Sequence, residues 1–169
     1  MTYKLKHPYN ILICMGALFV GFLLAYSITE TGVTTHIRDI KHVGTFEFTI
    51  FYKILFKNLI VGVLISVFGY FTCGLFSIVI LFWNGMLIGI IIKSNPIDSS
   101  IIPYFVYHGF FEITAFLCFG LIGINGFCFF VNLFRKNIIQ FDFSKTLFFF
   151  SVIVLFIAAI IETLLISYG

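Results

Sequence analysis

Charged residues are scarce in this sequence of 169 residues, which holds only 10 lysines and arginines and 7 aspartates and glutamates. Charged side chains therefore make up 10% of the chain, whereas a soluble domain averages about 25%. Hydrophobic residues make up 61%, and 25 residues are phenylalanine. A globule of this size leaves too much surface in water to bury so many apolar side chains. The composition excludes a soluble enzyme or a nucleic-acid-binding module and predicts an integral membrane protein.

Sequence signatures of metal centres, disulfides and membrane proteases are also missing. The cysteines form no CxxC pair and lie inside apolar runs, which favours small buried hydrophobic side chains over disulfides or zinc ligands. They are Cys14, Cys73, Cys118 and Cys128. The sequence has no HExxH motif, and no aspartate lies within a hydrophobic run, which argues against proteolysis inside the membrane. We therefore expect no enzymatic activity, no metal and no cofactor.

Hydrophobic runs long enough to cross a bilayer, which takes roughly 20 apolar residues, account for most of the chain. Residues 58–92 carry no charge and would extend about 52 Å as one helix, so we expect this run to fold back within residues 69–74. The expected spans are residues 9–28, 56–72, 75–92, 101–123 and 146–168. The pattern predicts an all-α fold, a polytopic bundle of about five transmembrane helices in a single membrane domain, residues 1–169.

Two segments near the N-terminus allow more than one interpretation. Residues 29–53 are the only extended polar stretch, and they predict either a polar loop or an interfacial amphipathic helix. Residues 9–28, preceded by Lys4 and Lys6, also resemble a secretory signal peptide. The length of the apolar run favours a retained helix.

Basic residues are divided evenly between the two sides of the membrane that these spans define. The N-terminal side has Lys4, Lys6, Arg135, Lys136 and Lys145, and the other side has Arg38, Lys41, Lys53, Lys57 and Lys93. Lysines before the first helix and the tight Arg135-Lys136 pair favour an N-terminus in the cytoplasm. We therefore expect a multi-pass protein of the cell membrane with a cytoplasmic N-terminus.

Two glutamates, Glu112 and Glu162, are the charged residues that fall inside the expected spans and away from their ends. A charge at the bilayer centre costs at least about 2.5 kcal/mol, so such residues usually face a bundle interior and have a partner. His108 precedes Glu112 by one helical turn, which places both side chains on one helix face, where they can hydrogen-bond. Gly109 beside them would let another helix approach closely.

Small residues accompany the other polar candidates. Gly85 and Gly89 form a GxxxG step beside Asn84, which predicts a tight helix contact with an amide available for bonding between helices. Glu162 follows a pair of alanines, so a neighbouring backbone could lie against that face of the last span.

Two interpretations of Asn84, His108, Glu112 and Glu162 stay open. In the first, these side chains lock the packing of the bundle or of a homo-oligomer. In the second, they line a cavity for an ion, a peptide or a lipid head group. A zinc site of His108, Glu112 and Glu162 is less favoured, because so few ligands are available.

Four sequence elements occur in a recognisable order. They are Lys57-Asn58-Leu59, then Trp83-Asn84-Gly85 with Gly89, then His108-Gly109-Phe110-Phe111-Glu112 with Ala115 and Gly120, and finally Ile161-Glu162. In this order they resemble the stage II sporulation protein M (SpoIIM) family of bacterial and archaeal membrane proteins, over about residues 54–165. The HGxxE element is the most specific part. The family usually continues with Glu-Leu-Pro-Ala, whereas this chain reads Glu112-Ile113-Thr114-Ala115 and lacks that proline.

The resemblance implies a non-enzymatic protein of the cell membrane. In spore-forming bacteria the namesake of the family is a scaffold for cell-wall hydrolases that remodel the septum. Short relatives occur in gene clusters for circular bacteriocins, beside ABC transporter components, where they are associated with maturation, export or self-protection. We expect a scaffold or accessory subunit for such membrane proteins, and the alternative is a transporter or binding protein with a midplane cavity for an ion or hydrophobic peptide.

Overall fold

The computed structural model describes residues 7–30, 46–94, 101–135 and 144–168, and for residues 7–8, 101–108 and 168 it describes the backbone alone. All regular structure within these ranges is helical, and five segments are long and apolar enough to cross a membrane. The predicted all-α bundle of five transmembrane helices is therefore confirmed.

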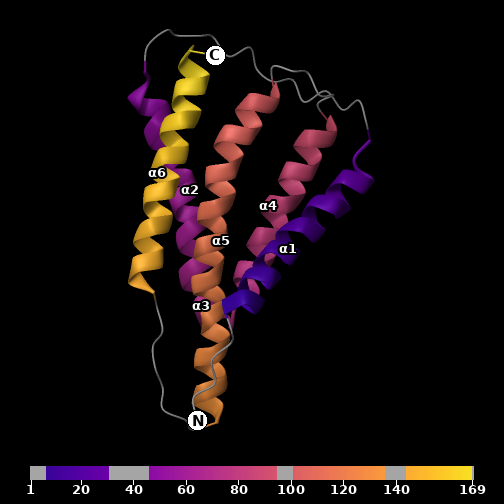
Figure 1. Cartoon of the computed structure of the whole chain (residues 1–169), viewed down its shortest axis with the longest axis vertical. Helices are drawn as coiled ribbons and strands as arrows, with labels where there is room; N and C mark the ends of the chain where they lie inside the picture. The colour runs from indigo at the N-terminus through magenta and orange to yellow at the C-terminus, as the bar shows by residue number, and fades with distance from the viewer. Residues whose placement is uncertain (1–6, 31–45, 95–100, 136–143, 169) are drawn as a thin grey trace.

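The helix α5 (Ile101–Phe134) lies at the centre of the bundle and contacts every other helix. On one side of it α1 (His7–Ile28) packs along α4 (Leu75–Ser94), and on the other side α2 (Phe48–Val63) packs against α6 (Lys145–Tyr168). Figure 1 shows that the α1–α4 pair leans away from α5 toward the end of the molecule where α5 begins. The two groups of helices meet closely only over the other half of the bundle.

The second span begins earlier than the sequence predicts. It is one helical run, Phe48–Phe71, made of α2, the π-helix η1 (Leu64–Phe68) and the short helix α3 (Gly69–Phe71). Residues 48–53, expected in the polar segment, therefore belong to this span, which contains both Lys53 and Lys57. Their two charges lower the local hydropathy, which is why a hydropathy-based start falls at residue 56. Residues 31–45 of the expected polar segment lie outside the described residues.

A turn of only three residues, 72–74, joins the second and third spans. Cys73 and Gly74 both have positive φ angles, 56° and 85°. The Thr72 hydroxyl donates to the carbonyl of Phe68 at 2.7 Å and accepts from the backbone N–H of Phe76 at 3.1 Å. One side chain thus satisfies backbone groups of both helices, which lets the chain reverse direction within three residues.

The helix α5 is also longer than expected. The sequence predicts a span that ends near residue 123 and loosens at Gly123 and Gly126, but α5 continues to Phe134. A methyl group on Gly123 would meet the carbonyl oxygen of Ile65 at 2.5 Å, and one on Gly126 would overlap the backbone of Tyr70. Both glycines therefore serve close packing against the second span rather than a break in the helix.

The core of the bundle lies around the middle of α5. Phe119 is fully buried and stacks edge-on against Phe148 of α6, with ring centroids 5.4 Å apart. Leu81 of α4 and Cys14 of α1 reach the same level from the other side, each fully buried. The remaining cluster is aliphatic and aromatic: Ile65, Ala115, Phe116, Ile122, Ile124, Val154 and Leu155.

Candidate functional site

Glycines bring the backbones of α1 and α4 into direct contact. A methyl group on Gly85 would overlap the carbonyl oxygen of Leu18, and one on Gly89 would lie 2.5 Å from the carbonyl oxygen of Phe22. From the other helix, Gly21 faces the carbonyl of Phe82 in the same way. The GxxxG step of the sequence therefore lies on the α1–α4 contact, where backbone carbonyls of one helix meet glycine Cα atoms of the other.

Asn84 lies beside this contact, half-buried in the middle of α4. Its amide nitrogen donates to the carbonyl of Ile80 at 2.9 Å, one turn earlier in the same helix. The sequence suggests a bond between helices for this amide, and the structure instead gives its N–H to its own helix. In a medium without water, the preceding carbonyl is the nearest acceptor.

The His108–Glu112 pair lies in the half of α5 from which α1 and α4 diverge. Glu112 is half-buried, and the side chain of His108 lies outside the described residues. Gly109 is expected to contact another helix, but no heavy atom lies within 4 Å of the position that its Cβ would occupy among the described residues. The divergence of the two helix groups explains this open space.

Glu162 is half-buried in the last third of α6. Its neighbours Ala158 and Ala159 are fully buried, and the Thr163 hydroxyl donates to the Ala159 carbonyl at 2.7 Å. This face of α6 therefore packs inside the bundle, where α6 contacts α5 and α2. Among the described residues, no group of three histidine, cysteine, aspartate or glutamate side chains could hold a metal ion.

A comparison with protein families places the chain in a family of known membrane proteins. The sequence model described as "Stage II sporulation protein M" matches residues 10–165, nearly the whole chain. The chain belongs to the SpoIIM family. Neither the comparison with curated proteins nor the comparison with solved structures gives a significant match. The matched region of this SpoIIM protein includes Asn84, His108, Glu112 and Glu162.

An asparagine bridge that sequence reasoning does not single out joins α1 to α5. The amide nitrogen of Asn10 donates to the side-chain oxygen of Asn125 at 3.0 Å. Asn10 is 1% exposed, and its own side-chain oxygen is buried without a hydrogen-bond partner among the described residues. The signal in the sequence is an asparagine in each of two apolar runs. Asn10 and Asn125 lie within two residues of the ends of the expected spans 9–28 and 101–123, where water would solvate them.

A second unforeseen polar contact joins α4 to the π-helix. The Ser77 hydroxyl donates to the carbonyl of Ile65 at 2.7 Å, and Ser77 is fully buried. Methyl groups on Gly69 or Gly123 would overlap this hydroxyl. A π-turn displaces backbone carbonyls from their usual partners, so a donor from a neighbouring helix stabilises it. Hydropathy and residue spacing do not identify such a turn in a sequence.

An apolar groove of about 620 Å³ runs along the outer side of the α1–α4 pair. Gly16 lies in it, with nothing within 4 Å of its Cβ position, and Trp83 is 60% exposed. The lining residues are Ile13, Gly16, Ala17, Val20, Ile78, Val79, Phe82 and Trp83. In a membrane such a groove would be filled by apolar chains, either of lipids or of another protein.

Proposed function

We propose that this SpoIIM protein is a non-enzymatic scaffold or accessory subunit that holds partner membrane proteins. Membership of the family over residues 10–165 carries the proposal. The chemistry of the bundle supports it, because several buried or half-buried polar side chains in the spans bond to helices of the same chain. Asn10 bonds to Asn125, Ser77 to Ile65 and Asn84 to Ile80.

The partners that this proposal implies follow from the family resemblance. They are cell-wall hydrolases in septal remodelling, or ABC transporter components in the maturation of, or immunity to, a bacteriocin. The longest stretch between two described segments is residues 31–45, so the described chain offers partners mainly its helices and short loops. Contact through the membrane-spanning surface is therefore the mode of binding that we propose.

We also propose that the N-terminus lies in the cytoplasm. With Lys53 and Lys57 inside the second span, the basic residues outside the spans are no longer evenly divided. By the same bounds Lys145 and Lys93 also lie in spans, so the N-terminal side keeps Lys4, Lys6, Arg135 and Lys136, whereas the other side keeps Arg38 and Lys41. An excess of lysine and arginine marks the cytoplasmic side of short loops.

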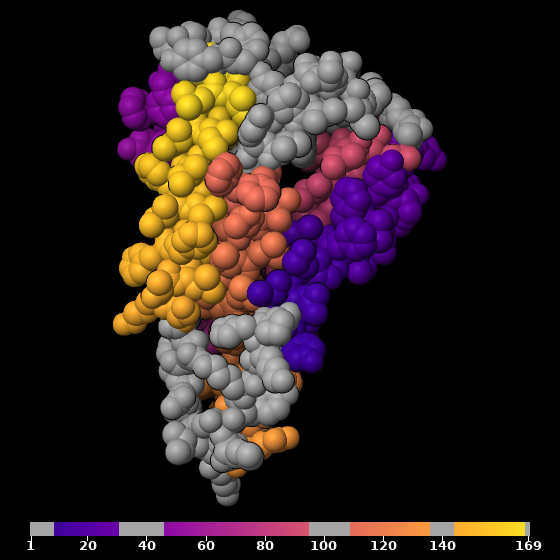
Figure 2. Space-filling view, viewed as in Figure 1, coloured from indigo at the N-terminus to yellow at the C-terminus, as the bar shows by residue number. Residues whose placement is uncertain are grey.

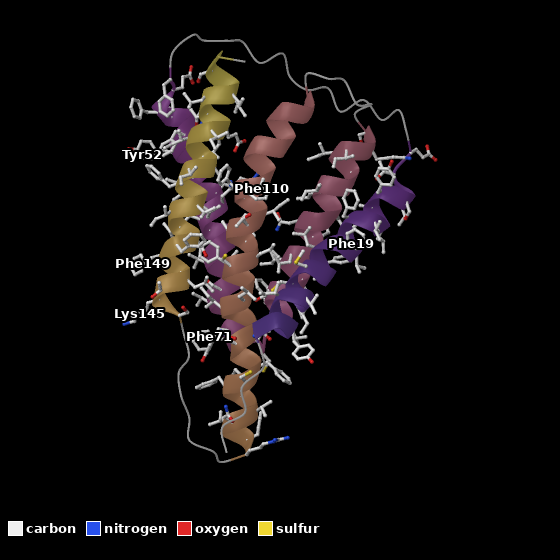
Figure 3. The ribbon with its side chains drawn as sticks, viewed as in Figure 1. Phe19, Tyr52, Phe71, Phe110, Lys145 and Phe149 are labelled. Atoms are coloured by element: carbon white, nitrogen blue, oxygen red, sulfur yellow. The ribbon has the colours of Figure 1, made fainter. Side chains whose placement is uncertain are left out.

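Site-specific photo-crosslinking in cells of the native host tests the scaffold proposal. A photoreactive amino acid is placed, one at a time, at exposed positions on different helices: Phe19 of α1, Phe71 of α3 and Phe149 of α6, which point outward in Figure 3. A scaffold should give discrete protein adducts from at least one of these faces. Adducts with lipid alone from every face would contradict the proposal.

A binding or transport function is the second candidate, and one observation favours it. Figure 2 shows an opening between α4 and the first half of α5, at the end where the helix groups diverge. Glu112 lies in that half of α5. Selective movement of a solute into vesicles that contain the purified protein, lost in Glu112→Gln, would favour this candidate over the scaffold.

A further inference from the structure

The outer face of α2 combines aromatic rings with two lysines. Phe48, Tyr52 and Phe56 follow one another at intervals of one turn and are 66%, 63% and 66% exposed. Lys53 and Lys57 form the adjacent row, one residue further along, and both are exposed. Figure 3 shows Tyr52 pointing away from the bundle. These five residues, in two adjacent rows, are therefore directed outward from the protein, and we call them the α2 face.

The position of Lys57 along the helix places it inside the hydrocarbon core. If Lys57 marked the membrane surface, the rest of the span, as far as Phe71, would cover only about 21 Å of a core about 30 Å thick. The core must therefore extend roughly 9 Å beyond Lys57, to about the level of Phe51. Lys53 lies close enough to that boundary for its side chain to reach the interface, whereas Lys57 lies one turn deeper.

The outer surface beside the α2 face is apolar. Phe51 of α2 contacts Phe156 of α6 edge-on, with ring centroids 5.3 Å apart, so these two helices lie side by side at this level. The residues that α6 exposes there are Ile153, Phe156 and Ile157. Among the described residues, neither Lys53 nor Lys57 has a hydrogen bond or an ion pair. Facing lipid, an ammonium group at this depth would be costly, and such residues normally have a partner.

We propose that the α2 face is the docking surface for a transmembrane helix of a partner protein, and that this helix carries an aspartate or glutamate that pairs with Lys57. The inference rests on the proposed scaffold function and adds the chemistry of the partner. A carboxylate complements the ammonium at a depth that phospholipid phosphates, which lie outside the hydrocarbon core, do not reach. The exposed rings of Tyr52 and Phe56 supply an apolar surface against which the helix can pack.

A defined peptide tests this proposal without knowledge of the natural partner. The full chain, labelled with a fluorescent donor on an N-terminal tag, is reconstituted into phosphatidylcholine vesicles with acceptor-labelled transmembrane peptides of leucine and alanine. One peptide has a glutamate at its centre, and matched peptides have glutamine or leucine there. Energy transfer then reports association. We expect the glutamate peptide to associate about tenfold more tightly than the leucine peptide, which corresponds to about 1.4 kcal/mol.

Lysine variants make the test specific. Lys57→Met should remove the preference for glutamate, and it should fold because it replaces a charge in the span by an apolar side chain of similar length. Lys57→Arg, which keeps the charge, should retain the preference. Lys53→Met and Lys145→Met, at exposed lysines nearer the interface, should also retain it. No preference for the glutamate peptide, or an equal preference in Lys57→Met, would overturn the proposal.

Other occupants of the α2 face would give different results. If the protein binds phosphatidylglycerol instead of the peptide, and this binding requires Lys57, the α2 face belongs to an anionic lipid and the proposal is overturned. Energy transfer between two copies of this chain that is lost in Lys57→Met would assign it to a second copy, with the same consequence. If the peptide fails to bind but photo-crosslinks to proteins form at other faces, only this inference fails and the scaffold function stands.

Discussion

At the scale of single residues, glycine determines how closely α1 and α4 approach each other. At Gly85 a hydrogen atom in place of a side chain lets the carbonyl of Leu18 lie against the α4 backbone. Gly16, on α1, lies in the open groove nearby and meets nothing. Gly85 therefore faces the backbone of another helix, whereas Gly16 does not.

Replacing Gly85 by alanine should therefore destabilise the protein, because the added methyl group forces the two backbones apart. We expect a loss of about 1–3 kcal/mol in the free energy of unfolding, the usual cost of overpacking. Gly16→Ala is the matched control and should leave it unchanged or raise it by up to about 1 kcal/mol, because alanine favours a helix and nothing opposes its methyl group. Unfolding of the purified variants in mixed micelles measures both values. Equal effects of the two substitutions would contradict the packing described for the α1–α4 contact.

The Asn10–Asn125 hydrogen bond should contribute measurably to stability. In a double-mutant cycle with Asn10→Ala and Asn125→Ala, we expect a coupling energy of about 0.6 kcal/mol, the average for hydrogen bonds between transmembrane helices. The cycle separates the bond from the loss of each side chain. Strictly additive effects of the two substitutions would show that the bond does not stabilise the bundle.

The sequence identifies some residues of the candidate site better than others. The glycines at Gly85 and Gly89 are recognisable because a fixed spacing of small residues is itself the physical requirement for close approach. The sequence does not identify the group that accepts the Asn84 N–H, because a carbonyl of the same helix and a group on another helix can accept this hydrogen bond equally well. Asn10 and Asn125 could not be paired from sequence, because nothing local relates positions so far apart in the chain.

At the scale of elements, the tight turn between the second and third spans concentrates unusual backbone geometry. Cys73 has a positive φ of 56°, a backbone conformation that residues other than glycine rarely adopt. Gly74, which follows with a φ of 85°, is suited to its position.

Substituting glycine for Cys73 should stabilise the turn. Relief of the left-handed strain outweighs the greater freedom of glycine in the unfolded chain, and we expect a net gain of about 0.5–1 kcal/mol. Cys73→Ala controls for loss of the thiol and should bring no gain. Thermal unfolding of the three proteins, followed by circular dichroism, measures the difference. A glycine variant that is no more stable than the alanine variant would contradict this account of the turn.

The elements were largely predictable from hydropathy, and the exceptions have physical causes. Residues 9–28, 75–92 and 146–168 were expected as spans, and the helices α1, α4 and α6 lie within two residues of those bounds. The start of α2 was not predictable, because Lys53 and Lys57 look like a membrane boundary in a hydropathy profile. The length of α5 was missed because its glycines, which serve close packing, resemble helix-breaking positions.

At the scale of the whole molecule, an odd number of spans places the two ends of the chain on opposite sides of the membrane. We expect a reporter active only in the cytoplasm to function when fused to the N-terminus, and a reporter active only outside it to function at the C-terminus. The basic residues outside the spans give the reason, because more of them lie on the N-terminal side. Both ends on one side would contradict five spans, and the reverse pattern would contradict the orientation.

The central proposal is that the polar residues buried in the spans, together with His108 and Glu112, hold the bundle together for binding partners rather than form a pathway. The most direct test measures Glu112→Gln and His108→Ala in two ways, as the folded fraction recovered from membranes and as solute movement into vesicles. We predict a lower folded fraction, with a loss of about 1 kcal/mol in stability, and no specific solute movement even for the unaltered protein. Normal folding with selective loss of solute movement would contradict the claim.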